Sequence, residues 1–481
     1  MEYKWVALSN TTIGILMASL DINIVLIALP TIGKELNGMN AFNVLWVILG
    51  YQLVIASVLV NFGRLSDIFG RVRLYTLGFA LFTVGSALCG LATNADQLIG
   101  FRIVQATGAA FLFSNSAAII TDAFPLHERG QALGINQISI VAGSVTGLIL
   151  GGALTTLLGW RWIFWVNVPI GIFATLWSFF KLRELSALST DHRLDIGGNL
   201  TFAGALLLML LAITLNAIVG LGTFTTISLV AIAALLLVIF VRIESRAPNP
   251  MFDLSLFKNR VFNAGNETIF LNSLSRGSFS LVMVFYLQGP LMNLTPLQAG
   301  IFLIPMSVAL SIMGPISGSI SDRIGYQKPV VVGLLVSAAG FLLMANIGKS
   351  VSELQLLIPL VLIGSGMGIF ASPNRSSIMN AVPGARRGVA SGISSTLVNV
   401  GNTMSIGLAF LIMEFSTPKA TLDGIFSGVS SSIVSFSVPG FVSSVHLVFI
   451  ISAAMLFASV LIYAFIGAKK RSAKLQNEVL H

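Results

Sequence analysis

Charged residues are scarce in this sequence, and their scarcity decides the class of protein. Only 9% of the 481 residues are Asp, Glu, Lys or Arg, whereas 55% are hydrophobic. A soluble domain carries about 25% charged residues, so this chain has too few to cover a surface that faces water. The mean hydropathy of +0.91 agrees with this reading. We expect most of the surface to face lipid.

Cysteine and histidine are equally rare, with one cysteine, Cys89, and four histidines. A single cysteine excludes an internal disulfide. The sequence also lacks the His-Glu-x-x-His, Gly-x-Ser-x-Gly and Walker motifs of metalloproteases, serine hydrolases and ATPases. We therefore expect no enzyme activity, no ATP-driven transport, no metal and no cofactor. An intramembrane enzyme or receptor is the weakest of the alternatives.

Long apolar runs take the place of the missing polar residues. A helix needs about 20 such residues to cross a bilayer, and fourteen runs qualify. They lie at 6–30, 42–62, 74–92, 97–120, 131–157, 162–180, 197–218, 223–241, 262–288, 297–317, 329–347, 355–378, 389–413 and 444–466. Backbone polar groups in lipid must find partners within the chain, so continuous runs predict helices. The predicted fold class is an all-α membrane protein with 14 transmembrane helices.

Basic residues are distributed unevenly between the two sides of such a bundle. With a cytoplasmic N-terminus, twenty Lys and Arg fall in inside segments, against four in outside loops, Lys34, Arg161, Lys349 and Lys419. The positive-inside rule then predicts that both termini are cytoplasmic, in a plasma membrane protein. The net charge of +9 is loop charge beside anionic lipid. We expect no nucleic-acid partner.

Two halves of the chain repeat each other. The stretch Gly63-Arg-Leu-Ser-Asp-Ile-Phe-Gly-Arg-Val-Arg73 returns as Gly318-Ser-Ile-Ser-Asp-Arg-Ile-Gly-Tyr-Gln-Lys328, 255 residues later (318 − 63). Residues 106–134 align without gaps on 364–392. Parallel repeats predict two equivalent bundles that rock around a substrate site between them.

The repeat also predicts the domain boundaries. We expect a six-helix bundle at 1–185, two inserted helices at 186–245, a second six-helix bundle at 246–468 and a polar, disordered cytoplasmic tail at 469–481. The outside loop 414–443 is long and rich in serine. It is either a flexible cap or a segment that lies on the surface.

These motifs resemble those of the Major Facilitator Superfamily, and within it the fourteen-helix branch of drug:proton antiporters. The matching segments are Gly63–Arg73, Leu20–Pro30, Trp160–Gly171 and the group Arg102, Gln105 and Gly108. The resemblance covers nearly the whole chain. It implies a monomeric secondary transporter that works by alternating access, as a proton-coupled multidrug exporter of lipophilic or cationic small molecules.

The fifth run departs from the antiporter pattern at one position. Leu148 stands where the pattern has a proline, although the glycines around it are in register. Proline kinks a helix because it removes a backbone donor, so leucine predicts a straighter helix. A uniporter, symporter or exporter of one specific metabolite or lipid therefore stays open as the alternative.

Five ionisable residues lie inside apolar runs: Asp21, Arg102, Glu267, Arg276 and Arg375. A charge at the bilayer centre costs roughly 2.5–3.5 kcal/mol, so these residues should pair or line a wet cavity. Asp21 and Arg102 both come to roughly 20 Å from the cytoplasmic side, so we expect them to meet. Glu267 lies where Arg375 can reach it, and Arg375 is expected to be structural.

We predict that Asp21 exchanges a proton for substrate as its surroundings alternate between wet and closed. The predicted substrate- and proton-binding residues are Asp21, Asn23, Arg102, Glu267 and Arg276. The alternative is a permanent pair between Asp21 and Arg102 that only ties two helices together.

The resemblance also implies a conformational latch in the repeated stretch. Its predicted members are Gly63, Asp67, Gly70, Arg71, Asp122 and, in the second half, Asp322. An arginine between two carboxylates makes charge-assisted hydrogen bonds. Asn380 replaces the second acid in the repeat, so the second latch should be weaker. The alternative is an ordinary solvated loop.

Glycines recur every four residues in the fifth run, at Gly143, Gly147 and Gly151, and Gly152 follows them. Small residues at this spacing share one helix face and allow another helix to approach closely. We expect the partner to be the tenth run, where Gly314 and Gly318 offer a similar face. Packing within one bundle is the alternative.

Overall fold

The computed structural model of the chain describes residues 2–479 except 126–127, 186–194, 219, 221, 248–249, 251, 290, 348–352, 384–385 and 428–437. Within this part, 14 helical segments are long and apolar enough to cross a membrane. The predicted fold class and the predicted number of spans are confirmed.

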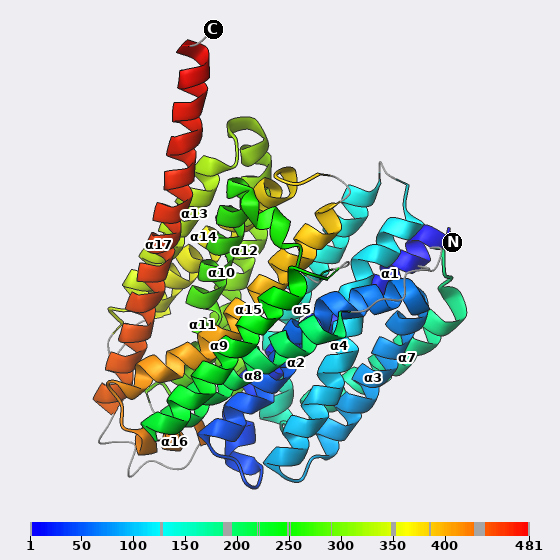
Figure 1. The fold of residues 1–481 in the computed structure, drawn as a ribbon. Coiled ribbons are helices and arrows are strands. Elements are labelled where there is room, and N and C mark those ends of the chain that lie inside the picture. Colours follow the sequence, from blue (N-terminus) through cyan, green and yellow to red (C-terminus); the bar gives the residue numbers. More distant parts are fainter. Residues whose placement is uncertain are drawn as a thin grey trace. The chain divides into compact units, whose positions relative to one another are not determined.

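The helices follow one another along the chain as Figure 1 shows. They are α1 (Tyr3–Glu35), α2 (Ala41–Phe69), α3 (Arg71–Leu91), α4 (Ala95–Ala123), α5 (Arg129–Leu157), α6 (Trp162–Trp165), α7 (Asn167–Lys181), α8 (Ile196–Ile218), α9 (Thr223–Glu244), η1 (Leu254–Lys258), α10 (Arg260–Arg276), α11 (Phe279–Gln288), α12 (Pro296–Ile324), α13 (Gln327–Met344), α14 (Glu353–Asn380), α15 (Arg387–Glu414), α16 (Lys419–Ser427) and α17 (Val438–Val479). Two spans are broken, since α6 with α7 and α10 with α11 each make one crossing.

The chain forms two compact units, which are described separately. The first comprises 1–251, 280–304 and 417–438, and the second 252–279, 305–416 and 439–481. The inserted helices α8 and α9 belong to the first unit, where α8 packs on α2 and α9 on α8. This division follows contacts rather than the repeat, so the boundaries expected from the repeat stay a prediction.

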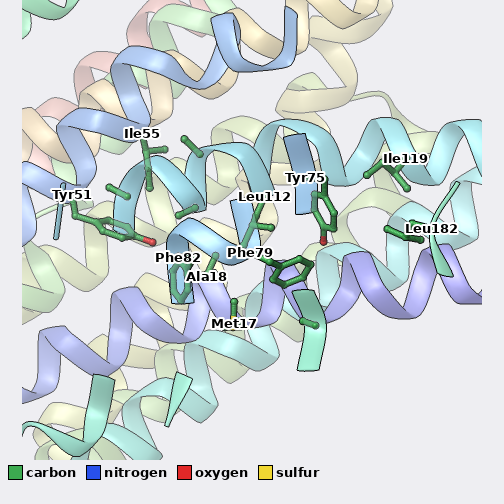
Figure 2. Close-up of a cluster of buried hydrophobic side chains, with 14 of the residues drawn as sticks. Met17, Ala18, Tyr51, Ile55, Tyr75, Phe79, Phe82, Leu112, Ile119 and Leu182 are labelled. Carbon is green, nitrogen blue, oxygen red and sulfur yellow. The ribbon is translucent and has the colours of Figure 1, made fainter. Parts of the chain in front are cut away.

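The core of the first unit is an apolar cluster to which α1 to α4 contribute most residues, together with Ala174 of α7 and Leu182 just after it (Figure 2). Its labelled members are Met17, Ala18, Tyr51, Ile55, Tyr75, Phe79, Phe82, Leu112, Ile119 and Leu182. Four of its buried members are aromatic, and among these Phe79 and Phe82 are fully buried. Buried rings contribute large contact areas, so the cluster holds the four helices in a fixed arrangement around the polar residues described below.

The repeat is visible in the structure in two features that occur in both halves, a glycine turn and a close crossing of two helices. Gly70 and Gly325 both have positive φ, at 107° and 82°, where a side chain would be strained. A Cβ on Gly108 would lie 2.6 Å from the carbonyl oxygen of Gly78, so α3 and α4 cross closely there. The second unit has the same crossing between α13 and α14, where a Cβ on Gly366 would lie 2.6 Å from the oxygen of Gly333.

One expectation about the C-terminal part needs correction, and one open alternative is resolved for residues 419–427. The segment after 469 was expected to be disordered, but α17 continues as one helix to Val479. The outside loop 414–443 contains α16, which belongs to the first unit and packs on α2. In α16 the carboxylate of Asp423 accepts from the backbone N–H of Ala41 at 2.8 Å, so this part of the loop is a docked segment.

Candidate functional site

Asp21 lies at the centre of a buried polar cluster in the first unit. Its side chain is fully buried on α1 and forms an ion pair with Arg102 of α4, with Oδ2 2.5 Å from Nη1. Its other oxygen accepts from Gln105 Nε2 at 2.8 Å and from Asn167 Nδ2 at 3.1 Å. Three donors from α4 and α7 therefore hold one carboxylate. The meeting of Asp21 and Arg102 that their depths predicted is confirmed.

Arg102 makes three further contacts besides its ion pair with Asp21. Its Nε donates to the carbonyl of Val47 on α2, and Nη1 also donates to Gln105 Oε1 at 2.7 Å. The guanidinium lies over the ring of Tyr51, 4.0 Å from the ring centroid. A cation over an aromatic face is worth up to about 2 kcal/mol when it is shielded from water. These contacts fix the arginine to α2 and α4 whether or not Asp21 is charged.

Close helix packing seals this cluster. A Cβ on Gly85 of α3 would lie 2.6 Å from the backbone nitrogen of Gln105. On the other side of α1, a Cβ on Gly147 of α5 would lie 3.0 Å from Cβ of Asn23. Asn23 is half-buried, and its amide donates to the carbonyl of Ser19 at 3.0 Å. The side chain of Asp21 is therefore fully enclosed by protein groups.

The candidate residues of the second unit make no comparable cluster. Glu267 on α10 is exposed and accepts from Asn263 Nδ2 at 2.7 Å. Within the described residues, neither Arg276 nor Arg375 has an ion pair. The expected pair between Glu267 and Arg375 is therefore not found among the described residues.

The predicted latch residues of the first half do come together. Arg71 donates from Nε to Asp67 Oδ1 at 2.8 Å, and its Nη1 lies 2.8 Å from both oxygens of Asp122. One guanidinium thus joins the end of α2 to the end of α4. Gly70 supplies the positive-φ turn before Arg71. Gly63 has open space around it and makes no close approach.

A further carboxylate, that of Glu184, lies at the start of α3 beside Arg71 and was not predicted. Its two oxygens accept from the backbone N–H groups of Arg71, at 3.1 Å, and Val72, at 3.0 Å. The first N–H groups of a helix have no partner within it, and an acid there is favoured by the helix dipole. Glu184 follows α7, so the chain beyond the sixth span caps α3 beside the latch.

In the second unit, Asp322 is exposed and has no ion pair with any described residue. Asn380, at the position equivalent to Asp122, donates only to Ser376 Oγ at 3.3 Å. This agrees with a weaker second latch, since the repeat lacks the acid that would hold an arginine.

Replacing Arg71 with alanine is expected to slow transport at least tenfold while substrate binding changes less than twofold. The latch lies at helix ends and its loss alters the balance between conformations, not the contacts of a substrate. Maximal rate and half-saturating concentration, measured in proteoliposomes, separate the two effects. Arg73→Ala is the control, because Arg73 is exposed two residues away. An unchanged rate in Arg71→Ala would leave Arg71 as an ordinary loop residue.

The glycine face of α5 has a partner within the first unit. A Cβ on Gly143 would lie 2.7 Å from the carbonyl of Leu16, and one on Gly151 would lie 2.9 Å from Cα of Ile24, so α1 covers this face. Gly314 has no neighbour within 4 Å, and Gly318 faces Ser372 of α14. Within the first unit this agrees with the alternative of packing within one bundle, because spacing shows that a face is small but not which helix fills it. The expected contact with Gly314 and Gly318, which lie in the second unit, stays a prediction.

The start of α12 does contact α5, beside this face. A Cβ on Gly152 would lie 2.6 Å from Cα of Leu297, and one on Gly300 would lie 2.4 Å from the carbonyl of Leu148. These residues all belong to the first unit. The helix α5 runs through Leu148 without interruption, in agreement with the absence of proline.

Reasoning from sequence missed Asn167, Tyr51 and Glu184 as functional candidates. Asn167 is a fully buried amide in the matched segment Trp160–Gly171, and a polar residue within an apolar run was the available signal. Tyr51 carries no such signal, since aromatic residues are common in the apolar runs. Glu184 lies outside the spans, where acids are ordinary.

Comparison with known proteins shows the family to which the chain belongs. The family model described as Major Facilitator Superfamily matches residues 11–406. The riboflavin transporter RibZ of Clostridioides difficile is 34% identical over 422 residues, covering 86% of this chain and 89% of RibZ. The multidrug resistance protein Stp of Mycobacterium tuberculosis is 34% identical over 402 residues, covering 83% of this chain and 74% of Stp.

Solved structures agree on the fold. A bacterial homolog of the human lysosomal transporter Spinster, in an inward-facing and occupied conformation, superposes with a TM-score of 0.69 at 16% identity, over 97% of each chain. An auto-inhibited peptide transporter of the POT family gives 0.69 at 15% identity, over 97% of this chain and 96% of the other.

Proposed function

Because the chain belongs to the Major Facilitator Superfamily, a family of transporters, we propose that it is a proton-coupled exporter of lipophilic small molecules. The observation that carries the proposal is the buried carboxylate of Asp21, which three donors hold inside a membrane-spanning unit. Intramembrane carboxylates of this kind mark proton relays in transporters.

The coupling follows from the arrangement around Asp21. In the closed cluster the carboxylate of Asp21 is paired with Arg102. When α1 moves away from α4 and water enters, the carboxylate loses Arg102 and becomes free to take up a proton. Arg102 stays in place because Tyr51 and Val47 hold it. Proton binding and helix separation are then linked, as an exchanger requires.

Several similar proteins are named for drug resistance, which supports a lipophilic substrate. Stp is one, and the multidrug resistance protein 3 of Bacillus subtilis, 29% identical over 87% of this chain and 81% of that protein, is another. We propose a location in the plasma membrane with cytoplasmic termini, following the basic inside loops, and a monomer that works without nucleic acid.

A specific metabolite is the second candidate, and two observations favour it. RibZ, which is similar over most of both chains, is named as a riboflavin transporter. Leu148 departs from the antiporter pattern, and α5 is uninterrupted there. A heteroaromatic vitamin would then be the substrate, carried with or without protons.

One transport experiment distinguishes the candidates. Proteoliposomes with an acidic interior would be given rhodamine 6G, fluorescein or riboflavin, and uptake compared with that of protein-free liposomes. The proposal predicts accumulation of at least one dye besides riboflavin, and its loss when nigericin collapses the pH gradient. Uptake of riboflavin alone would support the specific transporter, and uptake indifferent to nigericin would refute proton coupling.

A further inference from the structure

Arg276 carries its charge far from either end of a membrane span. It ends α10 within the crossing Arg260–Gln288, 16 residues (276 − 260) from one end and 12 (288 − 276) from the other. At 1.5 Å per residue these are about 24 Å and about 18 Å. Arginines near helix ends reach water by extending along the helix, but this one starts near the middle.

The second unit offers Arg276 no counter-charge. Within its described residues, no ion pair or hydrogen bond involves the Arg276 side chain, which is partly buried. The following Gly277 packs on α15, where its Cβ would lie 2.5 Å from Cα of Asn402, and Ser278 N–H donates to Ser405 Oγ at 2.9 Å. The backbone that follows Arg276 therefore packs on uncharged residues of α15.

The two acids inside the spans do not pair with Arg276, because one is bonded to other residues and the other lies on the opposite face of the same helix. Only Asp21 and Glu267 lie more than three residues inside a span. Both oxygens of Asp21 are occupied by its three donors. Glu267 lies nine residues before Arg276 on the same helix, which is about 14 Å along the axis and two and a half turns, hence the opposite face.

We propose that Arg276 recognises an acidic group of the substrate, so that the transported compounds are lipophilic acids such as carboxylates and phenolates. This rests on the proposed function and narrows its substrate class. A guanidinium binds a carboxylate through two parallel hydrogen bonds, and in a medium of low dielectric it strongly repels a cation. The cationic substrates expected from sequence are therefore disfavoured.

Neighbouring acceptors add a second feature of the substrate. Asn402 Oδ1 and Ser273 Oγ are buried without a hydrogen-bond partner among the described residues. Both lie at the contact of α10 with α15, where a Cβ on Gly401 would be 2.8 Å from Cβ of Ser273. A substrate with a hydroxyl or amide donor beside its acid would satisfy these atoms, and buried polar groups normally have such partners.

The test compares two dyes with one xanthene skeleton, the anion fluorescein and the cation rhodamine 6G. Binding to the purified full-length protein in detergent would be followed by fluorescence anisotropy, without any pH gradient. We expect the wild type to bind fluorescein at least tenfold more tightly, and Arg276→Gln to lose that preference. Arg276→Lys should keep part of it, and Arg276→Glu should reverse it towards rhodamine 6G.

Arg375→Gln is the matched control, because Arg375 is also an intramembrane arginine of the second unit without an ion pair. It should leave the dye preference unchanged. Arg276→Gln should not lower the melting temperature, since it removes an unpaired charge from the span. Equal binding of the two dyes by the wild type, or an unchanged preference in Arg276→Gln, would overturn the proposal. If binding depends on Arg276 but no pH gradient drives uptake, proton coupling fails and the recognition of acids stands.

Discussion

Asp21→Asn is expected to reduce proton-driven transport at least a hundredfold while the protein stays folded. Asparagine has nearly the same shape and keeps one oxygen, which can still accept from Gln105 and Asn167, but it cannot exchange a proton as a carboxylate does. The loss should appear as uptake that no longer responds to the pH gradient. Exchange of labelled for unlabelled substrate at equal pH should persist, because that reaction needs no net proton movement.

The folding of this variant must be checked, because it leaves a buried arginine without its carboxylate. Removing one partner of a buried ion pair costs about 3–5 kcal/mol. Arg102 keeps Val47, Gln105 and Tyr51, so we expect a smaller loss. The double variant Asp21→Asn with Arg102→Gln removes both charges and should recover stability but not coupling. Recovery of gradient-driven uptake in the double variant would show that the pair only joins helices.

Gly147→Ala is expected to destabilise the protein by about 1–3 kcal/mol, the usual cost of overpacking a filled contact. Its Cβ would lie 2.6 Å from the carbonyl of Leu20, next to Asp21 on α1, and a backbone atom cannot turn aside as a side chain can. Moving α1 would also disturb the Asp21 cluster, so transport should fall together with stability. The midpoint of thermal unfolding in detergent measures the first effect, and uptake the second.

Gly134→Ala, on the same helix, is the control for that change. A Cβ there has open space around it, and alanine favours a helix over glycine by roughly 0.5–1 kcal/mol. The two substitutions should therefore shift the melting temperature in opposite directions. A stabilised Gly147→Ala would mean that α1 and α5 are not in firm contact at this point.

Much of the fold could be predicted because it depends on lengths and distances measured along the chain. The length of apolar runs fixes the spans, and counting 1.5 Å per residue places Asp21 beside Arg102. The meeting of Asp67, Arg71 and Asp122 was expected from the family resemblance and from charges that lie at helix ends, and their role as a latch stays a prediction. These predictions depend on position along helices, which sequence records directly.

The remaining features depend on which helices touch, and sequence does not record that. The face of Gly143 and Gly147 is small in either arrangement, and only the structure shows that α1 fills it within the first unit. Asn167, the first residue of α7, donates to Asp21, and this contact between distant helices has no counterpart in the spacing of the sequence. The lack of an ion pair between Glu267 and Arg375 among the described residues is likewise an outcome of packing, since their depths in the membrane suggested a pair.

The most direct test of proton exchange at Asp21 is a proton flux driven by substrate alone. Proteoliposomes loaded with riboflavin, or with whichever dye the wild type carries, would be diluted into lightly buffered, substrate-free medium under a pH electrode. Exchange predicts that the medium becomes more alkaline as substrate leaves, and that Asp21→Asn abolishes this signal. Substrate release by the wild type without any proton movement would contradict it.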